Sequence, residues 1–147
     1  MSMNRRWWVA FGALALACGF AGNLGAAAPE GGQLKVAIKY KGAGKVDAAH
    51  QVIVWTFSTP QIDASSQPLA TQSVTSDGGA ASFTGLPKVV YIAAAFNEKG
   101  TYDGTSGPPP TGTPIVIYGD AGAAKAVDTG GPEASVTVTF DDSVRMP

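Results

Sequence analysis

Hydrophobic and polar residues alternate along several short segments of the chain, and clusters of Gly, Pro, Asp and Ser separate these segments. In residues 33–40, one face of an extended strand is formed by Leu34, Val36, Ile38 and Tyr40. Lys35 and Lys39 fall on the opposite face. A period of two residues is typical of a half-buried β-strand, and helical periodicity is nearly absent. The pattern predicts an all-β fold, with 33–40 as an outer strand that carries lysines on its solvent side.

The middle of the chain extends this pattern. Residues 51–58 form a second predicted strand in which Trp55 and Phe57 share one face, and residues 69–76 alternate more weakly, as expected for an edge strand. The sequence "SDGG" at 76–79 tolerates the positive φ angles of tight turns, so we expect it to close a hairpin with a return strand at 80–85.

The apolar run at 88–96 indicates a central strand that is covered on both faces. Its three alanines at 93–95 leave little volume, so we expect Trp55 and Phe57 to fill the space beside them. The last predicted strands are 115–118, 125–128 and 135–142. Seven or eight strands at this spacing predict a sandwich of two sheets.

The stretch 77–96 contains, in this order, a turn, an aromatic residue, a Gly-Leu-Pro corner and a strand with a tyrosine. The residues that carry it are Asp77, Gly78, Phe83, Gly85, Leu86, Pro87 and Tyr91. The order resembles that of carboxypeptidase regulatory-like domains, which belong to the prealbumin (transthyretin-like) class and are close in shape to collagen-adhesin B-type stalk domains. The resemblance implies a Greek-key β-sandwich that acts as a folding, spacing or binding module. The chain departs from it at Lys88 and Val89, where the family commonly has a glycine.

The N-terminus has the features of a secretory signal. Arg5 and Arg6 precede an apolar run of about 14 to 16 residues, which is shorter than the ~20 residues needed to span a bilayer. We expect cleavage after Ala27, which makes 1–27 the signal segment and 28–147 a single exported domain, periplasmic or extracellular. Cys18, the only cysteine, matches a lipoprotein signal imperfectly, so contact with a membrane is expected only if this residue is lipidated.

Composition argues against several kinds of chemistry. Residues 28–147 keep eight of the ten basic residues and all eleven acidic residues, so their formal net charge is −3, and no basic patch indicates nucleic-acid binding. A single histidine, His50, excludes a histidine-rich metal site. His50 leaves a small hydrolase as an alternative, but no "GxSxG" sequence accompanies it. We predict a protein that is not an enzyme and has no cofactor and no metal site.

The acidic residues near the C-terminus leave one further question open. Asp141 and Asp142 are adjacent, and Asp120 and Asp128 lie earlier in the chain. Calcium binds several oxygen ligands, and loops of a sandwich can bring such residues together, so calcium remains an alternative to a solvated strand end.

The segment 97–114 is long for a loop in a small domain and carries the candidate binding residues. They are Tyr102, Asp103, Pro108, Pro109, Pro110 and Tyr118, the last from the strand that follows. Three consecutive prolines favour an extended polyproline conformation, and tyrosine rings stack well on sugars and prolines. The sequence therefore predicts a binding or accessory module of the cell envelope that contacts a protein or a polysaccharide through this loop. The alternative is a structural subunit that pairs through the edge of strand 33–40.

Overall fold

The computed structural model describes residues 31–120 and 123–147, and the described part contains strands but no helix. The all-β prediction is confirmed, with more strands than the seven or eight expected because four of them have only two or three residues. The predicted signal segment and Cys18 lie outside the described residues. The strands are β1 (Gly32–Tyr40), β2 (Val52–Phe57), β3 (Ala70–Val74), β4 (Ala80–Leu86), β5 (Val89–Phe96), β6 (Ile115–Ile117), β7 (Gly119–Asp120), β8 (Ala123–Ala124), β9 (Val127–Asp128) and β10 (Ala134–Phe140).

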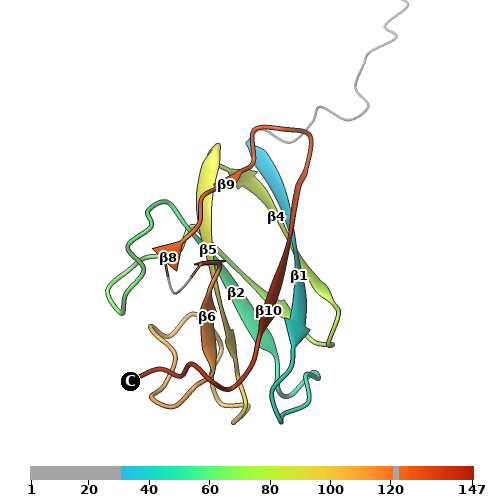
Figure 1. Cartoon of the computed structure of the whole chain (residues 1–147), viewed down its shortest axis with the longest axis vertical. Coiled ribbons are helices and arrows are strands. Elements are labelled where there is room, and N and C mark those ends of the chain that lie inside the picture. The colour runs from blue at the N-terminus through green and yellow to red at the C-terminus, as the bar shows by residue number, and fades with distance from the viewer. Residues whose placement is uncertain (1–30, 121–122) are drawn as a thin grey trace, which may run out of the picture.

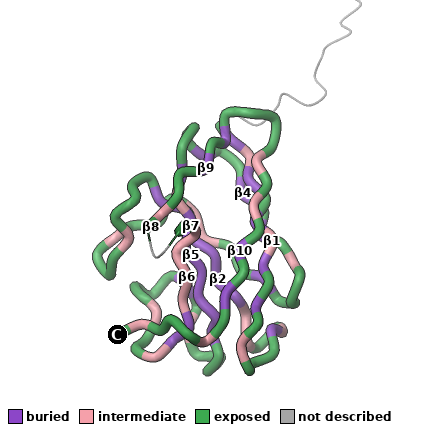
Figure 2. Tube along the Cα trace, in the orientation of Figure 1, coloured by how far each residue is buried: buried purple, intermediate pink, exposed green. Residues whose placement is uncertain are grey.

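Two main sheets make up the molecule (Figure 1). The smaller sheet has the order β10-β1-β4, and the larger has the order β3-β2-β5-β6, with β9 also paired to β5. Strands β7 and β8 form a separate two-stranded ribbon. The main hydrophobic cluster combines inward residues of both sheets, such as Val36 and Val138 from the smaller and Val54 and Ile92 from the larger. The fold therefore has the character of a β-sandwich, and the buried residues follow its strands (Figure 2).

The alternation predicted for β1 is confirmed, but its position in the sheet is not. Leu34, Val36, Ile38 and Tyr40 are buried and the two lysines are exposed. However, β1 pairs in parallel with β10 on one side and antiparallel with β4 on the other. The prediction that 33–40 offers a free edge is wrong, because its lysines reflect the solvent-facing side of the sheet and carry no information about its edges.

Strands β2 and β5 are buried on both faces. Trp55 lies opposite Ala93, and Ile53 lies opposite Ala95. Together with Phe57 these residues form a second hydrophobic cluster, on the face of the larger sheet that points away from the smaller sheet. Large side chains of β2 thus fill the space left by the alanines of β5, as predicted, although Ala94 belongs to the main cluster.

The turn at 77–79 connects the two sheets and does not close a hairpin. Its flanking strands, β3 and β4, belong to different sheets, so the hairpin prediction is wrong. The turn pairs with β1 instead: Gly78 N–H donates to Ile38 O, Ile38 N–H donates to Gly79 O, and Tyr40 N–H donates to the Asp77 carboxylate at 3.0 Å. Gly78 has a φ of +78°. Local turn chemistry is therefore correctly read from the sequence, whereas the choice of strand partner depends on distant residues.

The predicted corner after β4 is confirmed. Gly85 has a φ of +69°, Leu86 is buried, and the chain passes from the smaller sheet into β5 of the larger one. Phe83 of β4, the aromatic residue of the 77–96 stretch, is buried in the main cluster. These residues set the position of β5, whose far end leads into the 97–114 loop.

Candidate functional site

The 97–114 loop is fixed at its start by Asn97, which is buried at the end of β5. The backbone N–H of Asn97 donates to Gln51 O. Its side-chain amide donates to Tyr102 O at 2.6 Å and accepts from Tyr102 N–H at 3.3 Å. The Asn97 side chain thus bonds both the N–H and the C=O of Tyr102 and closes the first turn of the loop.

The next part of the loop packs over the second cluster on the larger sheet. The Trp55 indole N–H donates to Gly104 O at 3.0 Å, and the rings of Trp55 and Tyr102 are 6.2 Å apart. The Tyr102 hydroxyl donates to Gly107 O. Partial burial, with a smaller effect of Asp103, raises the pKa of Tyr102. Tyr102 therefore acts mainly as an anchor of the loop, with only part of its ring left for a ligand.

Asp103 stabilises the tip of this turn through its carboxylate. Its Oδ1 accepts from the N–H groups of Thr105 and Ser106 at 2.8 and 3.0 Å and from the Ser106 hydroxyl at 2.8 Å. These donors, first the Thr105 N–H and then the Ser106 hydroxyl, lower the pKa of Asp103 from 3.8 to about 2. The Asp103 carboxylate is therefore engaged in hydrogen bonds that hold the loop.

The C-terminal residues 143–147 fasten the second half of the loop. Gly112 N–H donates to Met146 O, and Met146 N–H donates to Thr113 O, both at 2.9 Å. The Arg145 guanidinium donates to Glu98 at 3.0 Å and to Gly112 O at 2.6 Å. Arg145 therefore connects the start of the loop to its end. Sequence reasoning did not identify this residue, because no local pattern relates an arginine to partners more than 30 positions away.

Between these attachments the prolines remain accessible. Pro108 and Pro110 are exposed and Pro109 is half-buried. A run of three prolines restricts the backbone to an extended conformation, and the neighbouring hydrogen bonds fix where this run lies. The loop is thus a supported surface with proline rings at its outer side.

Tyr118 does not join Tyr102 in one surface. Tyr118 packs against the main cluster between the sheets, whereas Tyr102 packs against the second cluster on the opposite face of the larger sheet. Successive residues of a strand point to opposite faces, so Ile115 and Ile117 share the side of Tyr102 and Val116 shares the side of Tyr118. These two candidate binding residues are near each other in sequence but lie on opposite faces of the larger sheet, so they do not form one aromatic surface.

His50 lies in the loop before β2, with its side chain 41% exposed. Its Nδ1 is 2.9 Å from the Asp47 carboxylate, and hydrogen bonds from His50, its backbone N–H first, lower the pKa of Asp47. The shallow hollow beside it is lined mainly by charged residues and Phe96, and none of the described lining residues is a serine, threonine or cysteine. This arrangement places a His-Asp pair at the surface without a nucleophile next to it.

Three of the four acidic residues considered for calcium already accept hydrogen bonds within the chain. The Asp141 carboxylate accepts from Ser143 N–H, Asp128 accepts from Gly130 N–H, and Asp142 accepts from Ala43 N–H and the Tyr40 hydroxyl. Burial, and then the contact with Asp142, raises the pKa of Tyr40. Over residues 31–120 and 123–147, no three His, Cys, Asp or Glu side chains come close enough to hold a metal ion.

Comparisons with known proteins found no counterpart for this chain. No family model matches the sequence, and no curated protein and no solved structure matches the chain. In the part that the structure describes, no helix is long and apolar enough to cross a membrane.

Proposed function

We propose that this chain is a non-enzymatic binding or accessory module of the cell envelope, and that it contacts its partner through the 97–114 loop. The observation that carries the proposal is the combination of a fastened loop with exposed prolines. Arg145 connects Glu98 with Gly112, and Pro108 and Pro110 remain exposed between the fastened parts. A surface that is already ordered loses little conformational entropy on binding.

A protein fits this surface better than a polysaccharide does. Polyproline segments bind to aromatic-lined grooves of partner proteins. Sugar binding would need a free aromatic face, but Tyr102 is half-buried and packs near Trp55. An envelope protein with an aromatic groove is therefore the proposed partner, and a polysaccharide is the second choice.

The architecture proposed for this module is the Greek-key sandwich of the carboxypeptidase regulatory-like, prealbumin-like class. Three features support it: the strand orders β10-β1-β4 and β3-β2-β5-β6, the parallel pairing of the first and last strands, and the crossings between sheets at 77–79 and 85–88. Export rests on the sequence of residues 1–27, with a basic start and an apolar run.

The test is site-specific photo-crosslinking from the exposed position 110 in the cells that produce the protein. We expect a crosslink to one envelope protein, and we expect replacement of all three prolines by alanine to abolish binding of that purified protein while the melting temperature stays nearly unchanged. Pro60→Ala in the 58–69 loop is the matched control. Unchanged binding by the triple variant would refute the proposal, and binding to purified envelope polysaccharide alone would replace the protein partner by a sugar.

A further inference from the structure

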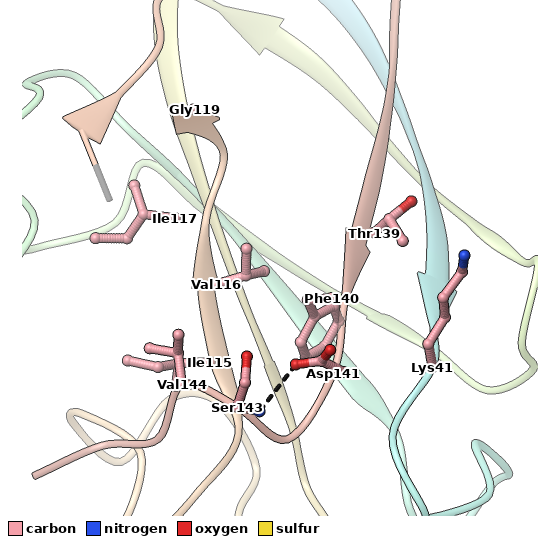
Figure 3. Close-up of a pocket in the computed structure, with 10 residues that line it drawn as sticks. All are labelled: Lys41, Ile115, Val116, Ile117, Gly119, Thr139, Phe140, Asp141, Ser143 and Val144. Carbon is pink, nitrogen blue, oxygen red and sulfur yellow. Dashed lines mark hydrogen bonds between the residues drawn. The ribbon is translucent and has the colours of Figure 1, made fainter. Parts of the chain in front are cut away.

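The two main sheets do not match in width on the side where β6 and β10 lie. Strand β10 ends the smaller sheet, whereas β6 ends the larger one, and in the described residues no strand pairs with the outer side of β10. A groove of about 380 Å³ runs between these two strands. Val116 and Phe140 point toward each other across it, and Val144 lies at one end (Figure 3). The groove is mainly apolar, and β10 lines it with Thr139 and Phe140, at the C-terminal end of the strand's unpaired side.

Backbone hydrogen bonds show which groups of β10 are free. Phe140 O accepts from Lys41 N–H of the β1 side at 2.8 Å. Backbone groups of successive strand residues point to opposite sides, so those of Ser135, Thr137 and Thr139 point away from β1 toward the groove side. Unpaired N–H and C=O groups in a row are a template for another strand.

The β10 edge lacks the features that usually block such pairing. Between positions 134 and 140 it has no Lys, no Pro and no charged side chain, and the outward residues are Ser and Thr. The opposite wall is partly protected, because Ile115 N–H on β6 already donates to Val144 O of the C-terminal segment. An added strand would therefore pair with β10 rather than with β6.

We propose that the groove accepts an extended strand of a partner protein, which pairs with the free edge of β10, places apolar side chains at alternate positions over Val116 and Phe140, and carries basic residues at its ends. The basic ends follow from the acidic residues that flank β10, since Glu133 precedes the strand, Asp141 follows it, and both are exposed. Lys41 lines the groove together with Asp141, so the net acidic charge is greater at the Glu133 end. This surface is separate from the exposed prolines, so the inference does not depend on the proposed function.

The same charges disfavour a second copy of this chain as the occupant. In an antiparallel pair of two β10 strands, the register that pairs all three outward residues centres on Thr137. That register places Glu133 of one copy opposite Asp141 of the other. Directly opposed like charges destabilise strand pairs.

The probe is an acetylated and amidated peptide of sequence KVTVTVK, titrated into the intact domain and followed by NMR. We expect saturable shifts at the amides of Ser135, Thr137 and Thr139 and at the Val116 methyl groups. The control peptide KTVVVTK has the same composition without alternation, and we expect it to bind about tenfold more weakly. Equal binding of both peptides, or shifts confined to other strands, would overturn the proposal.

Two further comparisons test the backbone pairing itself. Thr137→Pro removes one outward N–H and should weaken binding about tenfold, whereas Thr137→Val keeps that N–H and should bind as the native domain does. Because Thr137→Pro could unfold the domain, the peptide is also N-methylated either at its valines or at its threonines. Only one of these two peptides should lose binding, and retention by both would overturn strand pairing. A dimer of the native domain that is lost in Thr137→Pro would identify a second copy as the occupant and overturn the choice of a partner protein.

Discussion

Trp55 and Gly104 are joined by a hydrogen bond of 3.0 Å from the indole N–H to the backbone carbonyl, and this bond connects the centre of the larger sheet to the candidate binding loop. Trp55 is 7% exposed, so its indole N–H has little access to water when the bond is absent. The ring of a core tryptophan thus serves two purposes, since it fills the space beside Ala93 and positions the loop backbone.

Trp55→Phe is expected to increase the mobility of the loop while most of the core packing is kept. The variant keeps an aromatic ring but leaves the Gly104 carbonyl without its partner, which costs about 1–3 kcal/mol of unfolding free energy. Hydrogen exchange should accelerate at residues 102–107. Phe57→Leu changes the same cluster without touching this bond, so its exchange rates in the loop should stay close to native. Equal acceleration in both variants would show that cluster packing, and not the hydrogen bond, orders the loop.

Gly104→Ala and Gly107→Ala form a matched pair in the same loop. Both glycines have positive φ angles, +83° and +100°. A Cβ at Gly104 would lie 2.6 Å from Ile53 Cγ2, whereas a Cβ at Gly107 meets nothing within 4 Å. Urea unfolding should show that both variants lose about 1 kcal/mol for the backbone conformation and that Gly104→Ala loses about 1–3 kcal/mol more. Similar losses in both variants would contradict the packing described between the loop and β2.

Arg145→Met is expected to loosen the loop with little effect on overall stability. The Arg145 side chain is 38% exposed, and ion pairs of this kind contribute less than about 1 kcal/mol. The measurement is hydrogen exchange at residues 98–113 together with the melting temperature. Lys99→Met, which removes a neighbouring exposed charge, is the control and should leave the exchange unchanged. If Arg145→Met left the exchange of the loop amides at native rates, the connection between Glu98 and Gly112 would have no role in ordering the loop.

The carboxyl of Asp103 should titrate with a midpoint at about pH 2 in an NMR titration. Its pKa is lowered in the folded state, so the stabilisation it provides is present above its ordinary value of 3.8 and is lost as the pH falls through about 2. The amides of Thr105 and Ser106 should shift with the same midpoint. In Asp103→Asn this transition should vanish. A midpoint near 3.8 would mean that the carboxylate does not accept these hydrogen bonds in solution.

Local patterns in the sequence predicted the strands better than their arrangement. Alternation identified the buried face of β1, and the apolar run identified β5 as a central strand, because the hydrophobicity of each residue indicates whether its side of the strand is buried. The hydrophobicity of a strand does not indicate which other strand it pairs with. The turn at Gly78 was read correctly as a turn, but only the pairing of β4 with β1 shows that it changes sheets.

For the candidate site, too, local features were predicted from the sequence and long-range contacts were not. The sequence located the loop and its prolines, since length and composition are local properties. It did not show that Asn97, Trp55 and Arg145 hold the loop, because two of these contacts join residues 33 to 49 positions apart. A free edge was likewise assigned to β1, which lies in the middle of the smaller sheet, whereas the edge strands of that sheet in the described residues are β10 and β4.

The parallel pairing of β1 with β10 also determines how the domain responds to mechanical force. The two strands run in the same direction, with Leu34 beside Ala134 at one end and Tyr40 beside Phe140 at the other. Tension between the start of β1 and the end of β10 therefore acts along the strands and shears them past each other. The backbone bonds between the strands share this load and must break together, so the pairing of the first and last strands resists extension in a way that a hairpin opened from one end does not.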